Sequence, residues 1–395
     1  MTTDLQTLLA EIEVAASEIL NCERATVFVY DNERMELYSC VESRSEFVHI
    51  PADQGIAGAS FQSGKLLNIH DAYADPRFNP SVDRETGFKT RNMLVSPLTL
   101  ANNQILGVIE VLNKHGDGFN THDELLLETF AAQSAVSLHR QVLMEEFGER
   151  KRLQSELEIA KQIQLGLLPK NSPEIEGFEI AAWNGPAEET SGDFYDFQIL
   201  QDGRLLFIVA DVAGHGVGPA LLAAQCSALQ RAVFSMDCEL EKSLTKINQL
   251  LCEDIPNDRF ATAFLGRVDP DQNRIEAISA GHEPVYIYRA DTRLVERFDV
   301  CGLPLGIIDN YIYDEWQTIQ LNTHDILVAL TDGFLEGEDR QGNPFGTARI
   351  FDAIQQSSGL CAQNMIAFLR ESLARHSEGI RQADDLTAIV IKKVG

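Results

Sequence analysis

Aspartates recur at the ends of short apolar segments in the second half of this 395-residue sequence. Residues 205–209 are apolar and partly β-branched, with charge and glycine at both ends, which predicts a buried strand. Asp193 and Asp196 precede this strand and Asp211 follows it, so a hairpin would place Asp193 beside Asp211. Clustered carboxylates repel each other unless a cation lies between them, and oxygen-only ligands favour magnesium or manganese over zinc. Taken alone, the pattern is equally consistent with two ordinary Asp–Gly turns.

Two more acidic turns follow later in the chain. Residues 325–330 form an apolar segment that leads into Thr331-Asp332-Gly333, and Asp384 and Asp385 precede a final apolar segment at 388–391. Carboxylates at the junctions of several strands can converge on one edge of a β-rich core. The sequence therefore predicts a metal site assembled from residues far apart in the chain.

The order of these acidic segments resembles the metal-dependent serine/threonine phosphatases of the PPM (type 2C) superfamily, and within it the bacterial SpoIIE/RsbU branch. The segments are Gly192-Asp193-Phe194-Tyr195-Asp196, Asp211-Val212-Ala213-Gly214-His215-Gly216, Thr331-Asp332-Gly333 and Asp384-Asp385-Leu386-Thr387, with matches at 163–164, 167–169, 260–262, 280–284 and 302–306. Each motif is weak by itself, but together they follow the family's order over about residues 160–395. The resemblance implies an α/β/β/α sandwich, with outer helices on two packed sheets.

The resemblance also implies a set of metal ligands for two Mn²⁺ or Mg²⁺ ions. Asp211, Asp332, Asp384 and the backbone carbonyl of Val212 would be ligands, Asp211 would bridge both ions, and Asp193 would hold the second ion. A water held between two such ions becomes acidic enough to attack the phosphorus of phosphoserine or phosphothreonine. The expected activity is that of a protein phosphatase, and the expected substrate is an anti-anti-sigma protein of the STAS type.

Other residues near these motifs have less certain roles. His215 is a candidate proton donor to the leaving oxygen, although the acid histidine of the superfamily lies closer behind the bridging aspartate. His282 is expected to brace its glycine turn. Asp196 and Asp385 are each expected either to support the ligands or to be turn residues. Ser191 stands where the family has glycine, and the phosphate-binding arginine of eukaryotic relatives has no clear match.

Residues 1–145 predict a separate α+β domain. The expected order is a helix at 5–20, strands at 24–30, 36–40 and 66–69, a hairpin at 92–112 and a helix from 123. This order favours an antiparallel sheet with helices on one face. Segments 55–58, 67–73 and 75–78 resemble a GAF domain, a module that senses small molecules.

A sharper motif in this region consists of Asn113, Lys114, Phe119, Asp123 and Glu124. It resembles the NK…F…DE motif of cyclic-nucleotide-binding GAF domains, which suggests a cyclic nucleotide; another small ligand, or a role in dimerisation alone, stays open. Lys114 ends a strand and Asp123 begins a helix, so we expect a structural ion pair that pins one to the other.

A helical pattern continues from this domain toward the phosphatase-like region. Apolar and polar residues alternate in steps of three and four from Val136 to Leu167, with Glu146 and Arg150 interrupting the pattern, and Pro169 is expected to end the helix. The pattern favours a parallel coiled coil that makes the protein a homodimer, although a single amphipathic helix packed on its own chain fits as well. The predicted domains are thus 1–145, a signalling helix at 146–168, and 169–395.

The overall composition limits the classes of binding partner that we expect for this protein. The formal net charge of −28 argues against nucleic acid or an anionic membrane as a partner. No charged-then-apolar leader and no long apolar run occurs, which favours a cytoplasmic protein. We expect a GAF-regulated signalling phosphatase; the alternative is a non-catalytic GAF sensor whose phosphatase-like domain only binds partners.

Overall fold

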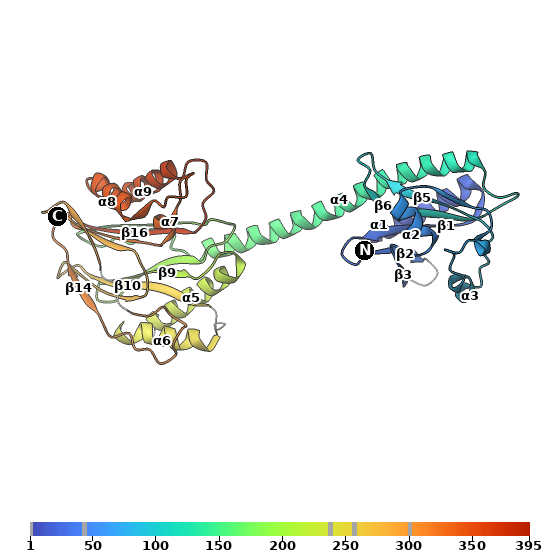
Figure 1. Ribbon diagram of the computed structural model, residues 1–395. Helices are drawn as coiled ribbons and strands as arrows, with labels where there is room; N and C mark the ends of the chain where they lie inside the picture. Colours follow the sequence, from blue (N-terminus) through green and yellow to red (C-terminus); the bar gives the residue numbers. More distant parts are fainter. Residues whose placement is uncertain (1–2, 42–45, 236–239, 255–258, 299–301) are drawn as a thin grey trace. The chain divides into compact units, whose positions relative to one another are not determined.

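The chain forms two compact units, Met1–Leu153 and Gln154–Gly395, in a computed structural model (Figure 1). The structure describes residues 3–41, 46–235, 240–254, 259–298 and 302–395. Within these ranges no helix combines the length and the apolar character needed to cross a membrane. The predicted boundaries at 145/146 and 168/169 stay predictions: one helix, Thr121–Leu165, runs through the first and ends before the second.

The N-terminal unit contains a six-stranded antiparallel sheet in the order β3-β2-β1-β6-β5-β4. Its strands are β1 (Cys22–Asp31), β2 (Glu36–Val41), β3 (Glu46–Pro51), β4 (Leu67–Ile69), β5 (Met93–Thr99) and β6 (Ile105–Lys114). Its helices are α1 (Thr3–Leu20), α2 (Gly55–Ser63), a 3₁₀ turn (Ala72–Ala74), α3 (Ser81–Thr86) and the start of α4 (Thr121–Leu165). The predicted antiparallel sheet is therefore confirmed.

The expectation that helices cover one face of this sheet is wrong. Ile109 and Val111 of β6 pack with α1 and α4, whereas Val108 and Leu112, which point the other way, pack with Ile56 of α2. The alternation along β6 is thus apolar on both sides, which requires cover on both faces. The short helix at 55–63 provides part of that second cover.

Helix α4 is continuous from Thr121 to Leu165. Its last residue, Leu165, lies four residues before Pro169, which leaves Leu167 of the predicted pattern outside the helix; the N–H of Gly166 still bonds to the carbonyl of Gln162. Val136, Leu143 and Leu153 of that pattern are at least 49% exposed in the single chain. An apolar stripe without cover on this helix is consistent with a coiled coil but does not establish one.

The C-terminal unit contains two five-stranded antiparallel sheets, in the orders β14-β11-β10-β9-β8 and β13-β12-β15-β16-β7. The strands are β7 (Phe178–Gly185), β8 (Asp193–Ile199), β9 (Leu205–Val212), β10 (Ala261–Asp269), β11 (Arg274–Ala280), β12 (Val285–Arg289), β13 (Leu294–Arg297), β14 (Gln317–Gln320), β15 (Ile326–Leu330) and β16 (Leu386–Lys393). The helices are α5 (Val217–Ser235), α6 (Leu240–Asp254), α7 (Gly333–Glu336), α8 (Gly346–Ser357) and α9 (Ala362–His376). In Figure 1, α5 and α6 cover one sheet and α8 and α9 the other, which confirms the predicted α/β/β/α sandwich.

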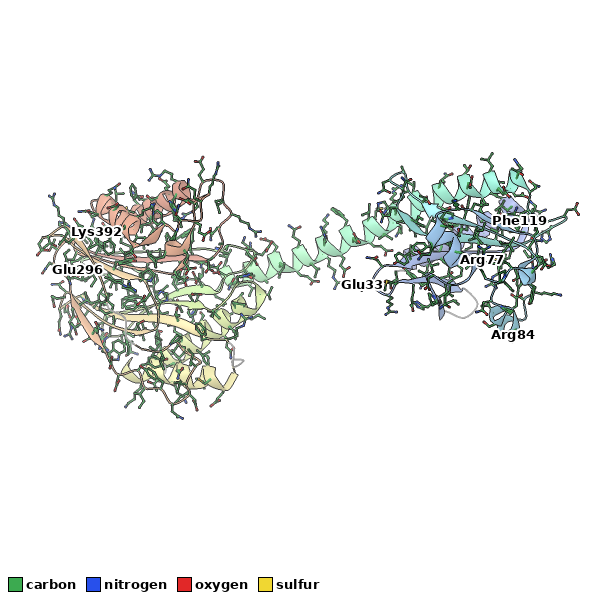
Figure 2. All side chains as sticks on the ribbon, viewed as in Figure 1. Glu33, Arg77, Arg84, Phe119, Glu296 and Lys392 are labelled. Carbon is green, nitrogen blue, oxygen red and sulfur yellow. The ribbon has the colours of Figure 1, made fainter. Side chains whose placement is uncertain are left out.

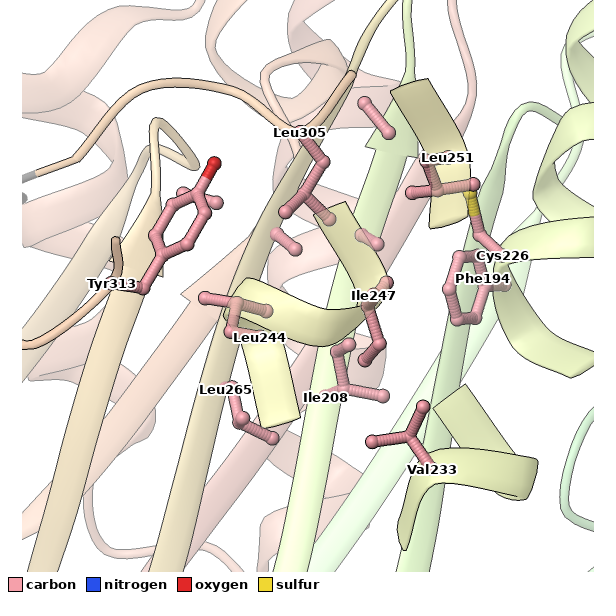
Figure 3. Close-up of a cluster of buried hydrophobic side chains, with 14 of the residues drawn as sticks. Phe194, Ile208, Cys226, Val233, Leu244, Ile247, Leu251, Leu265, Leu305 and Tyr313 are labelled. Carbon is pink, nitrogen blue, oxygen red and sulfur yellow. The ribbon is translucent and has the colours of Figure 1, made fainter. Parts of the chain in front are cut away.

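Strand β9 illustrates why the central strands are uniformly apolar. Phe207 and Val209 belong to the core between the two sheets, whereas Leu206 and Ile208 face the helices. Figure 3 shows Ile208 against Leu244, Ile247 and Val233 of α5 and α6. A strand buried on both faces reads as a continuous apolar run, and its tight packing fixes the strand ends that bear the aspartates.

The sequence missed β3, β13, β14 and α3. Strands β13 and β14 lie at sheet edges and contain polar, largely exposed residues, so they lack the alternation that identifies a strand.

Candidate active site

The hairpin of β8 and β9 places Asp193 directly opposite Asp211 in the antiparallel register. Opposed residues in such a pair have Cβ atoms about 5 Å apart. The two carboxyls also lie within hydrogen-bonding distance of each other. The predicted pairing of these two aspartates at one strand end is therefore confirmed.

Asp332 and Asp384 come to the same edge from the second sheet. Thr331 N–H bonds to the carbonyl of Thr387, which aligns the turn after β15 with the start of β16. Gly333 permits this approach, because a Cβ there would lie 2.2 Å from the carbonyl oxygen of Asp385. Burial, followed by the charges of Asp332 and Asp384, raises the pKa of Asp211 to about 7.

The other three carboxyls are perturbed in the same direction. Burial, together with the charges of Asp211 and Asp385, raises the pKa of Asp193 well above its usual range. Burial and the neighbouring Asp384 raise the pKa of Asp332 to about 6, and burial raises that of Asp384. Ionisation of all four carboxyls would place several negative charges close together, and a bound cation would stabilise that ionised form.

The proposed metal site is not formed by the acidic side chains alone. Among the described residues, no three acidic, histidine or cysteine side chains are gathered closely enough to hold a metal ion by themselves. Backbone carbonyls and water often complete hard-cation sites. The donor set consists of oxygen atoms only, which fits Mn²⁺ or Mg²⁺ and excludes the softer ligands that zinc prefers.

Asp193 is held by a network of hydroxyl groups. The Thr331 hydroxyl donates to its carboxylate at 2.8 Å, and its N–H donates to the Ser191 hydroxyl at 3.1 Å. Asn184 donates to the hydroxyls of both Ser191 and Thr387. Ser191, which departs from the family's glycine, therefore supports Asp193 rather than disturbing it.

The two supporting aspartates bind different partners. Asp385 accepts hydrogen bonds from the N–H groups of Gly192 and Ala187 at 2.6 and 2.7 Å, so it fixes the loop before β8. Asp196 accepts from the Arg231 guanidinium at 2.6 Å, which makes it an ion-pair partner rather than a free turn residue.

The two histidines differ in exposure. The side chain of His215 is 70% exposed and its Nδ1 lies 3.6 Å from Glu188. His282 is buried between the Leu330 carbonyl and the Thr262 hydroxyl, so its Nε2 must donate to the carbonyl while Nδ1 accepts from the hydroxyl. Burial lowers the pKa of His282 to about 4, which keeps the ring neutral and confirms that it braces its turn.

The GAF-like motif of the N-terminal unit forms a set of local ties. Lys114 Nζ donates to Asp123 at 2.7 Å and to the Leu20 carbonyl at 2.8 Å, which confirms the predicted ion pair. Asn113 is buried and donates to Glu23, and Glu124 accepts from Asn68, which also donates to the carbonyl of Phe119. Phe119, labelled in Figure 2, is 3% exposed. Lys114 and Asp123 thus hold β6 to α4, Asn113 ties β6 to β1, and Asn68 of β4 bonds to Glu124 and to the Phe119 carbonyl.

Comparison with known families identifies both units. Residues 201–394 match the family described as Stage II sporulation protein E (SpoIIE), and residues 4–138 match the GAF domain family. The chain carries a GAF domain followed by a SpoIIE-type phosphatase domain.

Individual relatives agree with this assignment. The chain is 26% identical over 246 residues to phosphoserine phosphatase RsbU of Bacillus subtilis, a match that covers 62% of this chain and 72% of RsbU. It is 27% identical over 264 residues to protein IcfG of Synechocystis sp., covering 60% of this chain but only 41% of IcfG. The solved SiaA-PP2C domain of Pseudomonas aeruginosa shares the fold, with a TM-score of 0.55, 22% identity, and coverage of 62% of this chain and 98% of that domain.

The phosphatase domain contains two contacts that the sequence did not reveal. Gln164, near the end of α4, accepts from Ser191 N–H at 2.9 Å and donates to the Ser191 carbonyl at 2.5 Å. Arg231 of α5 joins Asp196 to the carbonyl of Leu167, just beyond that helix. The end of α4 is thus bonded to the loop that leads into Asp193; the Ile163-Gln164 motif marked the position but not the contact.

Arg259 is a third residue that sequence reasoning missed. Its guanidinium Nη1 donates to the carbonyl of Ala213 at 3.0 Å and would lie 2.9 Å from a Cβ at Gly214. The φ of +96° at Gly214 favours glycine there, and the arginine holds the turn that follows Asp211 and Val212 in the phosphatase domain.

Proposed function

We propose that this protein hydrolyses phosphoserine or phosphothreonine on another protein, and that its GAF domain regulates the reaction. The observation that supports this most is the pairing of Asp193 with Asp211, next to Asp332 and Asp384; within the described residues no lysine or arginine forms an ion pair with any of the four, and His215 acts on Asp384 alone. The similarity to phosphoserine phosphatase RsbU supports the same activity.

The proposed site would hold two Mn²⁺ or Mg²⁺ ions. Asp193, Asp211, Asp332, Asp384 and the carbonyl of Val212 would be their ligands. Such ions supply an acidified water and neutralise the charge that develops on the phosphate. The chain's own residues orient these ligands: Thr331 and Ser191 hold Asp193, and the Gly333 turn holds Asp332.

His215 is the proposed proton donor to the leaving oxygen. Its ring is exposed to a bound substrate, and Glu188, 3.6 Å from its Nδ1, would hold the ring in place. Because His282 is neutral and fully engaged, it is not a second candidate for this role.

Regulation is proposed to pass along α4. Gln164 bonds to both backbone groups of Ser191, two residues before Asp193, so a small rotation of the helix end would alter the position of that carboxylate. The exposed apolar stripe through Val136, Leu143 and Leu153 supports a homodimer formed through the same helix.

The substrate and the GAF ligand are proposed on the resemblance alone. A STAS-type anti-anti-sigma protein is the proposed substrate, and a cyclic nucleotide or another small molecule the proposed GAF ligand. A cytoplasmic location stays a prediction, as does the absence of nucleic-acid and membrane partners, on the net charge of −28.

The test is Mn²⁺-dependent phosphate release from a phosphoserine peptide, with wild type compared to Asp211→Asn. Asp202→Asn is the matched control, because Asp202 lies in the turn at the other end of the same hairpin. We expect activity in wild type and Asp202→Asn and none in Asp211→Asn. Activity that survives in Asp211→Asn would contradict the proposed site.

The alternative function, a non-catalytic GAF sensor that docks partners, makes a different prediction. It requires a folded wild-type protein that releases no phosphate and binds no Mn²⁺.

A further inference from the structure

A groove of about 1000 Å³ adjoins the proposed metal site of the phosphatase domain. Its lining includes Asp384, which is a proposed metal ligand, and Gly333, which follows the proposed ligand Asp332 in the chain. It also includes Trp183, Arg370 and Ile380, which the proposed chemistry does not use. The volume lies at the upper end of the range for small-molecule pockets, about 300–1000 Å³.

One wall of the groove combines a flat apolar surface with a fixed cation. The guanidinium carbon of Arg370, on α9, lies 3.8 Å from the centre of the Trp183 ring. This stacking reduces the side-chain entropy that a partner would otherwise have to remove. Within the described residues neither Arg370 nor the nearby Arg381 forms an ion pair with a carboxylate, so both charges are available to a partner.

The rim of the groove offers polar and apolar contacts as well. Ser377 Oγ is buried and has no hydrogen-bond partner within the described ranges, and it belongs to the groove lining. Ile380 is 43% exposed beside it. Gln382 donates to the carbonyls of Gly185 and Asp384 at 2.9 and 2.8 Å, which ties this rim to the metal-site loop.

We propose that this groove binds the extended segment of the phosphoprotein substrate next to the phosphorylated residue. An apolar side chain of that segment packs on Trp183 and Ile380, and a carboxylate of the segment pairs with Arg370. The inference rests on the proposed function, because it takes the phosphate to bind at the metal ions that Asp384 would help to hold. The occupant follows from continuity: a peptide whose phosphate reaches the ions that Asp384 would help to hold has its neighbouring residues over the adjoining surface. The groove lining also contains Glu336, Glu338 and Glu378, so the acidic contact is assigned to Arg370, which is stacked on Trp183, and not to the groove as a whole.

The experiment compares two phosphoserine peptides and one small substrate on the full-length protein with Mn²⁺. The first peptide is Glu-Leu-Ala-pSer-Ala-Leu-Glu, the second has Lys in place of both Glu, and the small substrate is p-nitrophenyl phosphate. The variant is Arg370→Glu; the matched control is Arg375→Glu, because Arg375 is an exposed arginine of the same helix that does not line the groove. A second variant, Ile380→Asp, is compared with Ile199→Asp, at an exposed position of β8.

Wild type is expected to prefer the Glu peptide, with kcat/KM about ten-fold higher than for the Lys peptide, mostly through KM. Arg370→Glu should reverse this preference, and Ile380→Asp should lower kcat/KM for both peptides about five-fold. Hydrolysis of p-nitrophenyl phosphate should change less than two-fold in either variant, and both control variants should resemble wild type.

Two results would overturn the proposal: an unchanged peptide preference in Arg370→Glu, or equal losses for the peptides and p-nitrophenyl phosphate. A wild type that hydrolyses none of the three substrates would instead contradict the proposed function. The groove is then judged by fluorescence anisotropy of a labelled Glu peptide with a non-hydrolysable phosphonate at the serine. Weaker binding by Arg370→Glu than by Arg375→Glu supports the groove, and equal binding contradicts it.

Discussion

Buried aspartates in the two domains have opposite surroundings. In the GAF domain, Asp123 lies 2.7 Å from the Lys114 ammonium, and both side chains are at most 16% exposed. In the phosphatase domain, Asp193 faces the carboxyl of Asp211, and burial and like charge raise the pKa of both. Asp123 lies in the first turn of α4 and Asp193 begins β8, so the difference lies in the partner and not in the local fold.

The contrast separates a structural charge from a functional one. A buried carboxylate with a cation and hydrogen-bond donors already has a stable charged form, so its removal affects folding. Buried carboxylates that face each other are stable only if protons or a metal ion neutralise them. A buried aspartate therefore indicates a structural ion pair in the GAF domain and a cation-binding site in the phosphatase domain.

The largest expected effect is the loss of phosphatase activity when a carboxyl of the acidic cluster is replaced. Asp332→Asn should lower Mn²⁺-dependent phosphate release about 1000-fold or more, because the proposed ligand loses its charge. In EDTA the same variant should unfold at the same or a higher urea concentration than wild type, since a repulsive charge has been removed. If Asp332→Asn lost stability in EDTA but kept its activity, Asp332 would be a structural residue like Asp123, and the proposed difference between the two domains would be wrong.

The matching change in the GAF domain should act on folding instead. Asp123→Asn leaves Lys114 without its counter-charge and should cost about 3 kcal/mol of unfolding free energy in that domain. Calorimetric unfolding of the full-length protein measures it as a lower transition temperature for one of two transitions. The double variant Lys114→Met with Asp123→Leu should recover much of the loss; a double variant as unstable as the single one would show that the pair's charge is not the cause.

His282 makes the stability of the phosphatase domain depend on pH. Its folded pKa of about 4 lies below the ordinary 6.5, so the contribution is complete above about pH 6.5 and is lost as the pH falls toward 4. The expected loss is about 3 kcal/mol, read as the difference between wild type and His282→Gln in urea unfolding. Both tryptophans, Trp183 and Trp316, belong to this domain, so their fluorescence reports it alone. Identical pH profiles for the two proteins would contradict a neutral structural role.

Glu110 should give the GAF domain the opposite pH dependence. Burial raises the pKa of this carboxyl from 4.5 to about 7, so the stability it allows is complete below about pH 4.5 and is lost as the pH rises to 7. Because the side chain is only half-buried, the expected loss is about 2 kcal/mol. Replacement by glutamine should flatten the pH profile of the GAF transition in calorimetry, and a variant with the wild-type slope would assign that slope to other groups.

The smallest expected effect concerns the contact between α4 and the Ser191 loop. Gln164→Ala should lower turnover about five-fold with little change in stability, because it removes two hydrogen bonds that position the loop before Asp193. Gln162→Ala is the matched control, since Gln162 is an exposed glutamine in the same helical turn. Equal activity of both variants would show that this contact does not set the metal-site geometry.

Much of the site could be predicted from the sequence because it depends on local patterns. Apolar runs such as 205–209 mark strands buried on both faces, and an aspartate at the end of each run lies at a sheet edge. The pairing of Asp193 with Asp211 follows from a short hairpin. These relations need no knowledge of the rest of the fold.

The remaining features depend on tertiary contacts that leave no local pattern. Asp385 bonds to N–H groups almost 200 positions earlier in the chain, and Arg259 meets the Ala213 carbonyl only after the sheet has formed. The second covered face of the GAF sheet was missed because α2 is short. The groove beside Trp183 was missed because it is formed by parts of the chain that only the packed sandwich brings together.

The most direct test of the central claim is isothermal titration of Mn²⁺ into the full-length protein, beside Asp211→Asn and Asp202→Asn. If the acidic cluster around Asp193 and Asp211 binds divalent cations, wild type and Asp202→Asn should bind two Mn²⁺ per chain. Asp211→Asn should lose both sites or retain one weak site. Equal Mn²⁺ binding by all three proteins would contradict the account.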